Sequence, residues 1–273
     1  MITGKILGDK YVINGMSADA SGKVPYMSAD TYYEVIRLID GKLLFLPDHL
    51  KRLRQSVSGS GTAYPGSQKI MESLGLLIKG NPFRKGNIRL ILQQSDENEP
   101  LLQCYFVPYF YPDPNMYTKG VKLHIYPHMR PNPGIKKWDD QFRNSVSRYI
   151  LEHEVYEVAL KNRQNQITEG SRSNIFFIDR AGRLISAPGN DILQGITRKY
   201  VLELAAGQGI RIEERTISAG TLDDLVSVFI SGTSPKVLPV KQIDDFFFDV
   251  NHPLLRLLMN QFEHLVLNSL KLL

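Results

Sequence analysis

The fold is indicated most strongly by the stretch Ile167-Thr168-Glu169-Gly170-Ser171-Arg172-Ser173-Asn174-Ile175-Phe176-Phe177. A single glutamate, Glu169, lies at the edge of a strand whose apolar pattern suggests burial, and a turn of glycine and serine follows it. A buried carboxylate is costly unless a cation or hydrogen-bond donors compensate it. We therefore expect Glu169 to have a cationic partner, which is either a ligand or a nearby arginine.

A second motif, Gln194-Gly195-Ile196-Thr197-Arg198, opens a helical pattern. Threonine favours the start of a helix, where free backbone N–H groups lie at the positive end of the helix dipole. Such a helix start binds anions readily. The motif predicts either an anion site or an ordinary helix cap.

Two further stretches suit a phosphate. In Phe229-Ile230-Ser231-Gly232-Thr233-Ser234-Pro235, a buried strand runs into small residues, and the hydroxyls of Thr233 and Ser234 match phosphate oxygens. In Asp48-His49-Leu50-Lys51-Arg52, His49 and Arg52 share a helix face, and an arginine fork grips phosphate well. An ordinary turn and a surface arginine are the alternatives.

Around these motifs, strand and helix patterns alternate over the whole chain. Asp40-Gly41 predicts a hairpin between strands at 35–39 and 43–46, and Pro47-Asp48 predicts a helix start. Residues 110–119 are rich in turn formers. We expect a mixed α/β (α+β) protein with a smaller N-terminal domain over residues 1–113, a linker over 114–119, and a larger C-terminal domain over 120–273.

The composition is that of a soluble globular protein, with 42% hydrophobic and 22% charged residues. The net charge of +5 is scattered rather than clustered, which argues against nucleic-acid binding. One cysteine, Cys104, excludes an internal disulfide and a cysteine metal cluster, so we expect no metal site. No segment is long and apolar enough for a bilayer, and the first residues lack the apolar core of a secretion signal. A cytoplasmic protein without membrane partners is the expectation.

Taken together, the motifs resemble the class IV (fold-type IV) aminotransferases, which include branched-chain aminotransferases, D-amino-acid aminotransferases and aminodeoxychorismate lyases. The most specific stretches are Thr168 to Asn174 and Leu193 to Arg198, and Thr197 follows Glu169 by 28 positions, as in that family. The resemblance implies a two-domain D-amino-acid-aminotransferase-like fold with pyridoxal 5′-phosphate (PLP) at the domain junction. It also implies a homodimer.

The resemblance assigns roles to particular residues. Glu169 would keep the pyridine nitrogen protonated, so that the ring acts as an electron sink. Leu193 would pack on one face of the ring, and Tyr33 would lie near the substrate. The expected cofactor-binding residues are Arg52, Glu169, Ser173, Asn174, Leu193, Gly195, Ile196, Thr197, Thr233 and Ser234.

The amine is less well defined by the sequence. PLP chemistry needs a lysine that forms a Schiff base and later moves a proton. The segment Ile135-Lys136-Lys137-Trp138 lacks the family's usual Asn-Tyr-Leu, and both lysines fall at the family's distance ahead of Glu169. On a strand only one of them can face the ring. We choose Lys136; Lys137 is the alternative, and a loop in which neither lysine enters the site is the third.

Substrate recognition also departs from the family patterns. Glutamines, Gln93 and Gln94, stand where D-amino-acid aminotransferases usually carry an arginine, and Arg89 only partly echoes the branched-chain pattern. Arg89 could bind a substrate carboxylate or pair with an acidic residue, and Thr233 is a further substrate candidate. The first hypothesis is an aminotransferase acting between an amino acid and a 2-oxo acid. The alternatives are an aminodeoxychorismate lyase that releases 4-aminobenzoate and pyruvate, and a non-catalytic PLP-binding protein.

Overall fold

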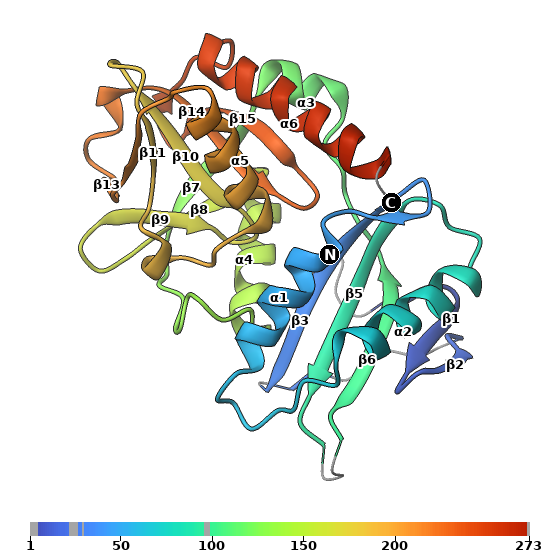
Figure 1. The fold of residues 1–273 in the computed structure, drawn as a ribbon. Coiled ribbons are helices and arrows are strands. Elements are labelled where there is room, and N and C mark those ends of the chain that lie inside the picture. The colour runs from blue at the N-terminus through green and yellow to red at the C-terminus, as the bar shows by residue number, and fades with distance from the viewer. Residues whose placement is uncertain (1–4, 22–26, 29, 96–98, 272–273) are drawn as a thin grey trace. The chain divides into compact units, whose positions relative to one another are not determined.

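The computed structural model describes residues 5–21, 27–28, 30–95 and 99–271. Residues 1–4, which bear on the expectation about a secretion signal, lie outside this range. The chain divides into two compact units, each described below by itself (Figure 1). Unit 1 comprises residues 1–110, 135–140 and 269–273, and unit 2 comprises residues 111–134 and 141–268. The predicted mixed α/β class is confirmed.

Unit 1 is built on one antiparallel sheet in the order β2-β1-β6-β5-β3-β4. Its strands are β1 (Leu7–Ile13), β2 (Met16–Asp19), β3 (Thr31–Ile39), β4 (Lys42–Leu43), β5 (Gly86–Gln93) and β6 (Leu101–Val107). The predicted hairpin at Asp40-Gly41 joins β3 to β4, and both turn residues have positive φ, of 51° and 83°. These angles suit the tight turn that Asp-Gly favours.

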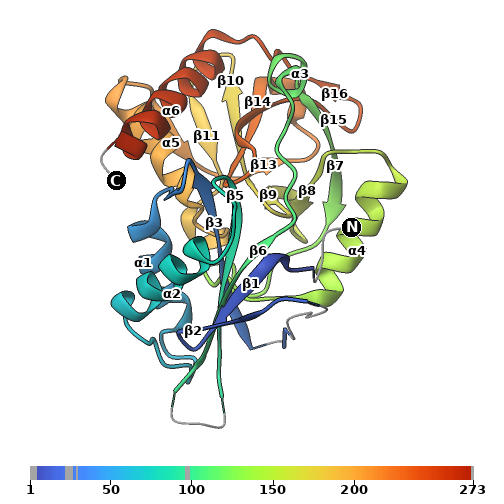
Figure 2. The same ribbon diagram turned by 90° about the vertical axis from the view of Figure 1, so that its right-hand side faces the viewer.

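Two helices, α1 (Leu46–Val57) and α2 (Ser67–Lys79), cover one face of this sheet (Figure 2). Pro47 stands in the first turn of α1, where its missing N–H costs nothing. Leu53 and Leu74 are fully buried against the sheet. Cys104 is buried in the same core, where burial raises the pKa of its thiol, so it is the structural thiol that the sequence predicts.

The short segment 135–138 pairs with the outer edge of β3. The Tyr33 amide donates to the Lys136 carbonyl (3.2 Å), the Trp138 amide donates to the Thr31 carbonyl (2.8 Å), and Lys137 lies opposite Tyr32 in an antiparallel bridge. Two residues after Trp138 the chain enters α4 (Asp140–Glu152). The Lys137 amide also donates to the Ile135 carbonyl (3.1 Å), so the backbone turns at Lys136 and the segment is not a regular strand.

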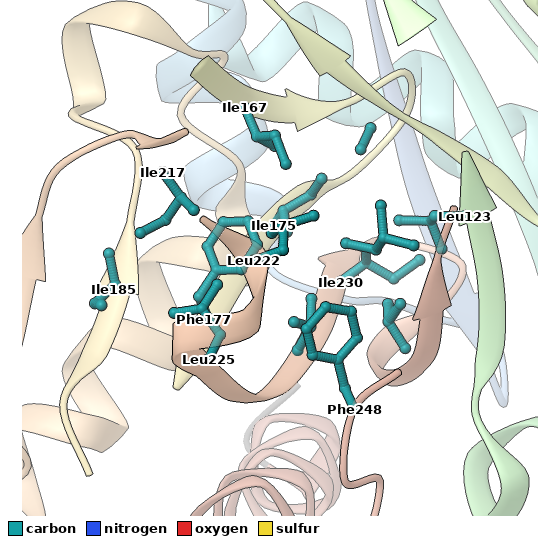
Figure 3. Packing of buried hydrophobic residues seen from close by; sticks show 14 of the residues in the cluster. Leu123, Ile167, Ile175, Phe177, Ile185, Ile217, Leu222, Leu225, Ile230 and Phe248 are labelled. Carbon is teal, nitrogen blue, oxygen red and sulfur yellow. The ribbon is translucent and has the colours of Figure 1, made fainter. Parts of the chain in front are cut away.

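Unit 2 contains a larger mixed sheet in the order β12-β11-β10-β14-β15-β7-β8-β9-β13, with β16 paired to β15. Its central strands are β7 (Val121–Pro127), β8 (Glu157–Lys161), β9 (Gln166–Gly170), β10 (Asn174–Asp179), β14 (Leu225–Gly232) and β15 (Lys236–Ile243). Its shorter strands are β11 (Leu184–Ser186), β12 (Ile212–Glu214), β13 (Ile217–Ser218) and β16 (Phe246–Phe247). Figure 3 shows the apolar core of this unit, in which Ile175, Phe177 and Ile230 come from neighbouring strands.

The helices of unit 2 include one that the sequence did not predict. Residues 114–119, expected as a linker, form the short helix α3 (Pro114–Lys119). The Asp113 side chain accepts from the Met116 amide (3.1 Å) and caps this helix, so turn-forming residues here start a helix. The domain boundaries at 113 and 120 stay a prediction. The other helices are α5 (Ile196–Gly207) and α6 (Pro253–Lys271), and no described helix is long and apolar enough to span a membrane.

Gly120, directly after α3, provides a test of this local structure. Its φ is 70°, and a Cβ there would lie 2.7 Å from Val250 Cγ1 and 2.9 Å from the Lys241 amide nitrogen. We predict that Gly120→Ala lowers the free energy of unfolding by about 2 kcal/mol, measured by urea denaturation. Gly134→Ala is the control, because nothing lies within 4 Å of its added Cβ, and it should be neutral or slightly stabilising. Equal stabilities of the two variants would contradict this account.

Candidate active site

In unit 1, Arg52 is held by a buried carboxylate. Arg52 Nε and one terminal nitrogen donate to the two oxygens of Glu34 (2.7 and 2.6 Å), and His49 Nδ1 lies 2.8 Å from Glu34 Oε2. Glu34 is completely buried; burial opposes its ionisation, but Arg52 and His49 together hold the pKa of Glu34 well below its usual value. Burial lowers the pKa of His49, with Arg52 and Lys136 adding to this effect, so His49 is neutral at physiological pH.

The two neighbouring lysines, Lys136 and Lys137, have different surroundings. The Lys136 Nζ lies 4.7 Å from the centre of the Tyr33 ring, and its charge reaches buried His49. The Lys137 Nζ pairs with exposed Asp30 (2.9 Å), and this hydrogen bond raises the pKa of Lys137. Lys137 is therefore protonated and turned towards solvent, whereas Lys136 lies among buried groups.

Arg89 lies in an aromatic cluster on the sheet face opposite α1. Its guanidinium carbon is 4.8 Å from the Trp138 ring centre and 5.9 Å from that of Tyr105, and Tyr33 packs edge-on against Trp138. Arg89 is 7% exposed, and its Nε has no hydrogen-bond partner among the described residues. It also forms no ion pair within the described part of the chain, so the acidic partner considered from the sequence is not found there.

In unit 2, Glu169 has the cationic partner that its burial predicts. Arg130 Nε donates to Glu169 Oε1 (2.9 Å), and a terminal nitrogen of Arg130 donates to the Ser171 carbonyl (3.3 Å). The other oxygen, Glu169 Oε2, accepts from the Leu193 amide (3.2 Å). A carboxylate with these partners is favoured in its ionised form.

Asn174 links this carboxylate to the start of α5. Its amide nitrogen donates to the Leu193 carbonyl (2.8 Å), so the backbone of Leu193 is held from both sides. A Cβ on Gly195 would lie 2.1 Å from Asn174 Oδ1, and only glycine allows this approach. Gly195 is the N-cap of α5 and provides no side-chain cap for the first turn, in which Ile196 and Thr197 are buried.

The end of β14 and the turn that follows it carry several hydroxyl groups. Ser231 is the cross-strand partner of Asn174, and its buried Oγ has no hydrogen-bond partner among the residues that the structure describes. Thr233 and Ser234 lie half-buried in the turn between β14 and β15. Since α5 packs on β14, its uncapped first turn and these hydroxyls belong to one part of unit 2 (Figure 1).

One predicted contact residue has another role in the structure. The Ser173 hydroxyl donates to the buried carboxylate of Glu157 (2.9 Å). No hydrogen bond among the described residues joins this hydroxyl to Glu169. Thus Lys136, Tyr33, Arg52 and Arg89 lie in unit 1, and the structure brings Glu169, Asn174, Leu193 and Gly195 together in unit 2. Two hydrogen bonds to the Leu193 backbone and the close approach of Gly195 to Asn174 join the group in unit 2.

Sequence reasoning missed Glu34, Arg130 and Glu157 as site residues. Glu34 could have been found, because it stands at the position of a strand face otherwise occupied by apolar residues such as Ile36 and Leu38. Arg130 stands in a proline-rich stretch without periodicity, and its contact with Glu169 spans 39 positions, so no local signal marks it. No cluster of potential metal ligands occurs among the described residues.

Comparison with known proteins identifies the family of this chain. The family model "Amino-transferase class IV" matches residues 31–243, which is most of the chain. The chain belongs to the class IV aminotransferases. This confirms the family that the sequence motifs resemble, and with it the assignment as an enzyme of the aminotransferase class.

Relatives and solved structures support the same family. The chain is 26% identical over 234 residues to a D-alanine aminotransferase of Listeria monocytogenes, covering 80% of each chain. It is 35% identical over 115 residues to a probable branched-chain-amino-acid aminotransferase of Thermotoga maritima, covering 41% of this chain and 42% of that protein. The branched-chain aminotransferase structure from Escherichia coli has a TM-score of 0.84 at 21% identity and covers 95% of both chains. This class IV aminotransferase therefore has the fold expected from the resemblance.

The Glu34 cluster of unit 1 gives a prediction that does not depend on cofactor. Glu34→Gln removes a buried anion and leaves Arg52 without its bidentate partner, so the free energy of unfolding should fall by about 3 kcal/mol. Urea denaturation of the cofactor-free protein at pH 7.5 measures it. The control is Glu72→Gln, because Glu72 lies on the exposed face of α2 and accepts from Gln68 (2.8 Å). It should change the free energy of unfolding by less than about 0.5 kcal/mol. Similar losses in both variants would show that the buried cluster contributes no more than a surface contact.

Proposed function

We propose that this class IV aminotransferase binds PLP, holds it through Lys136, and transfers an amino group between an amino acid and a 2-oxo acid. The observation that carries the proposal is the different surroundings of two adjacent lysines. Lys136 lies against Tyr33 and near buried His49, whereas Lys137 pairs with exposed Asp30. A lysine held among buried groups, rather than paired with an exposed carboxylate, is the kind that serves as a nucleophile.

The residues present fit PLP. Glu169 offers an ionised carboxylate, and Arg130 keeps it so, which suits a protonated pyridine nitrogen. The N-cap of α5 makes no side-chain cap hydrogen bond, and the buried Ser231 hydroxyl has no hydrogen-bond partner within the described ranges, as expected beside a polar ligand. The phosphate would be held by Ile196, Thr197, Thr233 and Ser234, with Arg52 as the cation.

Each residue then has a defined task. PLP, when bound, supplies the electron sink that makes the substrate Cα proton acidic. Lys136 Nζ takes this proton and returns it. Glu169 keeps the ring nitrogen protonated, and Arg130 keeps Glu169 from taking that proton. Glu34 fixes the orientation of the Arg52 fork, which is proposed to bind the phosphate.

The lysine assignment is tested by chemical trapping. Borohydride reduction of the PLP-loaded protein should leave a pyridoxyl group on Lys136, identified by peptide mass spectrometry. Lys136→Ala should abolish amino transfer, a loss of at least about 10³-fold, because the group that moves the proton is removed.

Lys137→Ala is the matched control, since it removes the adjacent amine that pairs with Asp30. It should retain the label on Lys136 and most of the activity. A label on Lys137, or equal loss of activity in both variants, contradicts the assignment. A protein that takes no label and transfers no amino group would fit a non-catalytic member of the family.

Arg89 is proposed to bind the substrate carboxylate, with Tyr33 beside it. A buried guanidinium without an ion pair among the described residues is compensated when an anion binds. Arg89→Gln should raise the KM for both the amino acid and the 2-oxo acid by about tenfold or more, and should leave the affinity for PLP unchanged. Arg84→Gln is the control, because Arg84 is exposed and donates to the Asp40 carbonyl. An unchanged KM in Arg89→Gln would remove Arg89 from the substrate site.

The donor is proposed among small amino acids. The relatives that match 80% of this chain are named D-alanine aminotransferases, whereas the branched-chain relatives share a shorter segment. D-alanine, L-leucine and L-valine, each tested with 2-oxoglutarate, distinguish the two classes. One solved structure with a TM-score of 0.76 is described as a putative 4-amino-4-deoxychorismate lyase. Release of pyruvate and 4-aminobenzoate from aminodeoxychorismate would favour that alternative.

We also propose a homodimer, which the resemblance implies, and a cytoplasmic location, which follows from the sequence expectation of no membrane segment and no secretion signal. Sedimentation equilibrium of the purified protein measures the first.

A further inference from the structure

Glu157, the first residue of β8, is a buried carboxylate without a role in the proposed mechanism. It is 2% exposed, and among the described residues the hydrogen bonds to its side chain come from three consecutive residues. Glu157 Oε1 accepts from the Ser171 hydroxyl and from the Arg172 amide (3.1 Å), and Oε2 accepts from the Ser173 hydroxyl (2.9 Å). Within the described part of the chain its ion-pair partner is the Arg172 side chain, which is 58% exposed and whose Nε lies 3.9 Å from Glu157 Oε1.

The turn that Glu157 holds is tightly closed. The Gly170 amide donates to the Ser173 carbonyl (2.8 Å), and the Ser171 amide donates to the Val158 carbonyl (3.3 Å). A Cβ on Gly170 would lie 2.2 Å from Ser173 Oγ and 3.3 Å from Glu157 Cδ. The two serine hydroxyls of this turn thus donate to Glu157. In a turn at the surface they would contact solvent instead.

This turn joins the residues that surround the proposed ring site. Glu169 immediately precedes it and Asn174 immediately follows it, and both hold the backbone of Leu193. The Ser171 carbonyl within the turn accepts from Arg130, whose Nε donates to Glu169. The turn therefore fixes Glu169 directly along the chain and also through its arginine partner.

We propose that Glu157 is a positioning residue that aims Glu169 at the PLP ring nitrogen by holding the turn 170–173. The inference rests on the proposed function. Glu157 touches no reacting atom; its effect passes through the two serine hydroxyls and one amide. The reach of its side chain is therefore what counts, rather than its charge.

Two substitutions separate reach from charge. Glu157→Asp keeps the charge, but its carboxylate is one methylene short of Ser171 and Ser173. Glu157→Gln keeps the reach, and because a hydroxyl can accept as well as donate, Ser173 can accept from the glutamine amide. Positioning predicts that the aspartate variant is impaired and that the glutamine variant is rescued.

The experiment loads the full-length protein with PLP labelled with ¹⁵N in the ring. The ¹⁵N chemical shift reports whether the ring nitrogen is protonated, and fluorescence titration of the apoprotein gives the Kd for PLP. In Glu157→Asp the shift should move towards that of unprotonated pyridine, and the Kd should rise about tenfold, as for the loss of a hydrogen bond to a charged group. In Glu157→Gln both should stay within about twofold of wild type.

Asp179 provides the matched control. It is also a buried carboxylate that holds a turn in unit 2, accepting from the Ala181 and Arg183 amides (3.0 and 2.9 Å), but it lies at the end of β10 opposite to Asn174. Asp179→Ala should lower thermal stability and leave the ¹⁵N shift unchanged.

A wild-type shift in Glu157→Asp, equal impairment in Glu157→Gln, or the same shift change in Asp179→Ala overturns the inference alone. Wild-type protein that does not bind PLP overturns the proposed function and the inference together.

Discussion

The ion pair between Glu169 and Arg130 is the interaction on which the chemistry of unit 2 depends. A carboxylate that is 3% exposed is stable as an anion only with strong partners, and Arg130 and the Leu193 amide provide them. These partners then constrain the surrounding chain. Arg130 binds the carbonyl of the 170–173 turn, Leu193 is held by Asn174, and Asn174 requires glycine at the cap of α5. One buried charge therefore determines why a glycine, an asparagine and a closed turn occur where they do.

Unit 1 also contains a buried carboxylate, but its partners are different. Glu34 is buried with Arg52 and His49 on the helix-covered face of its sheet, while Arg89 and the aromatic rings of Tyr33 and Trp138 occupy the opposite face. The 135–138 segment runs along the edge of β3, and Lys136 belongs to it. In this unit the buried acid fixes a cation proposed to bind phosphate, whereas in unit 2 a partly buried arginine keeps a buried acid ionised. Both arrangements prepare charge before any ligand arrives, which reduces the reorganisation needed on binding.

Much of the fold could be predicted from the sequence because its signals are local. Asp40-Gly41 specified the hairpin, Pro47 the start of α1, and the apolar runs around Ile175 and Ile230 the central strands. The helix at 114–119 was missed because its residues are also turn formers, and only the Asp113 cap distinguishes the two outcomes. The sequence identified Glu169 and the need for a cation, but not that Arg130 meets this need from 39 residues away. The different surroundings of Lys136 and Lys137 depend on the pairing of their segment with β3, which no local pattern encodes.

The central claim is that Glu169, kept ionised by Arg130, binds the ring nitrogen of PLP. Binding of PLP can be compared with binding of the carbocyclic analogue in which C–H replaces that nitrogen, by fluorescence titration of wild type and Glu169→Gln. Wild type should bind PLP at least about tenfold more tightly than the analogue, and Glu169→Gln should lose this preference. Equal affinity of the wild type for both compounds would contradict this claim.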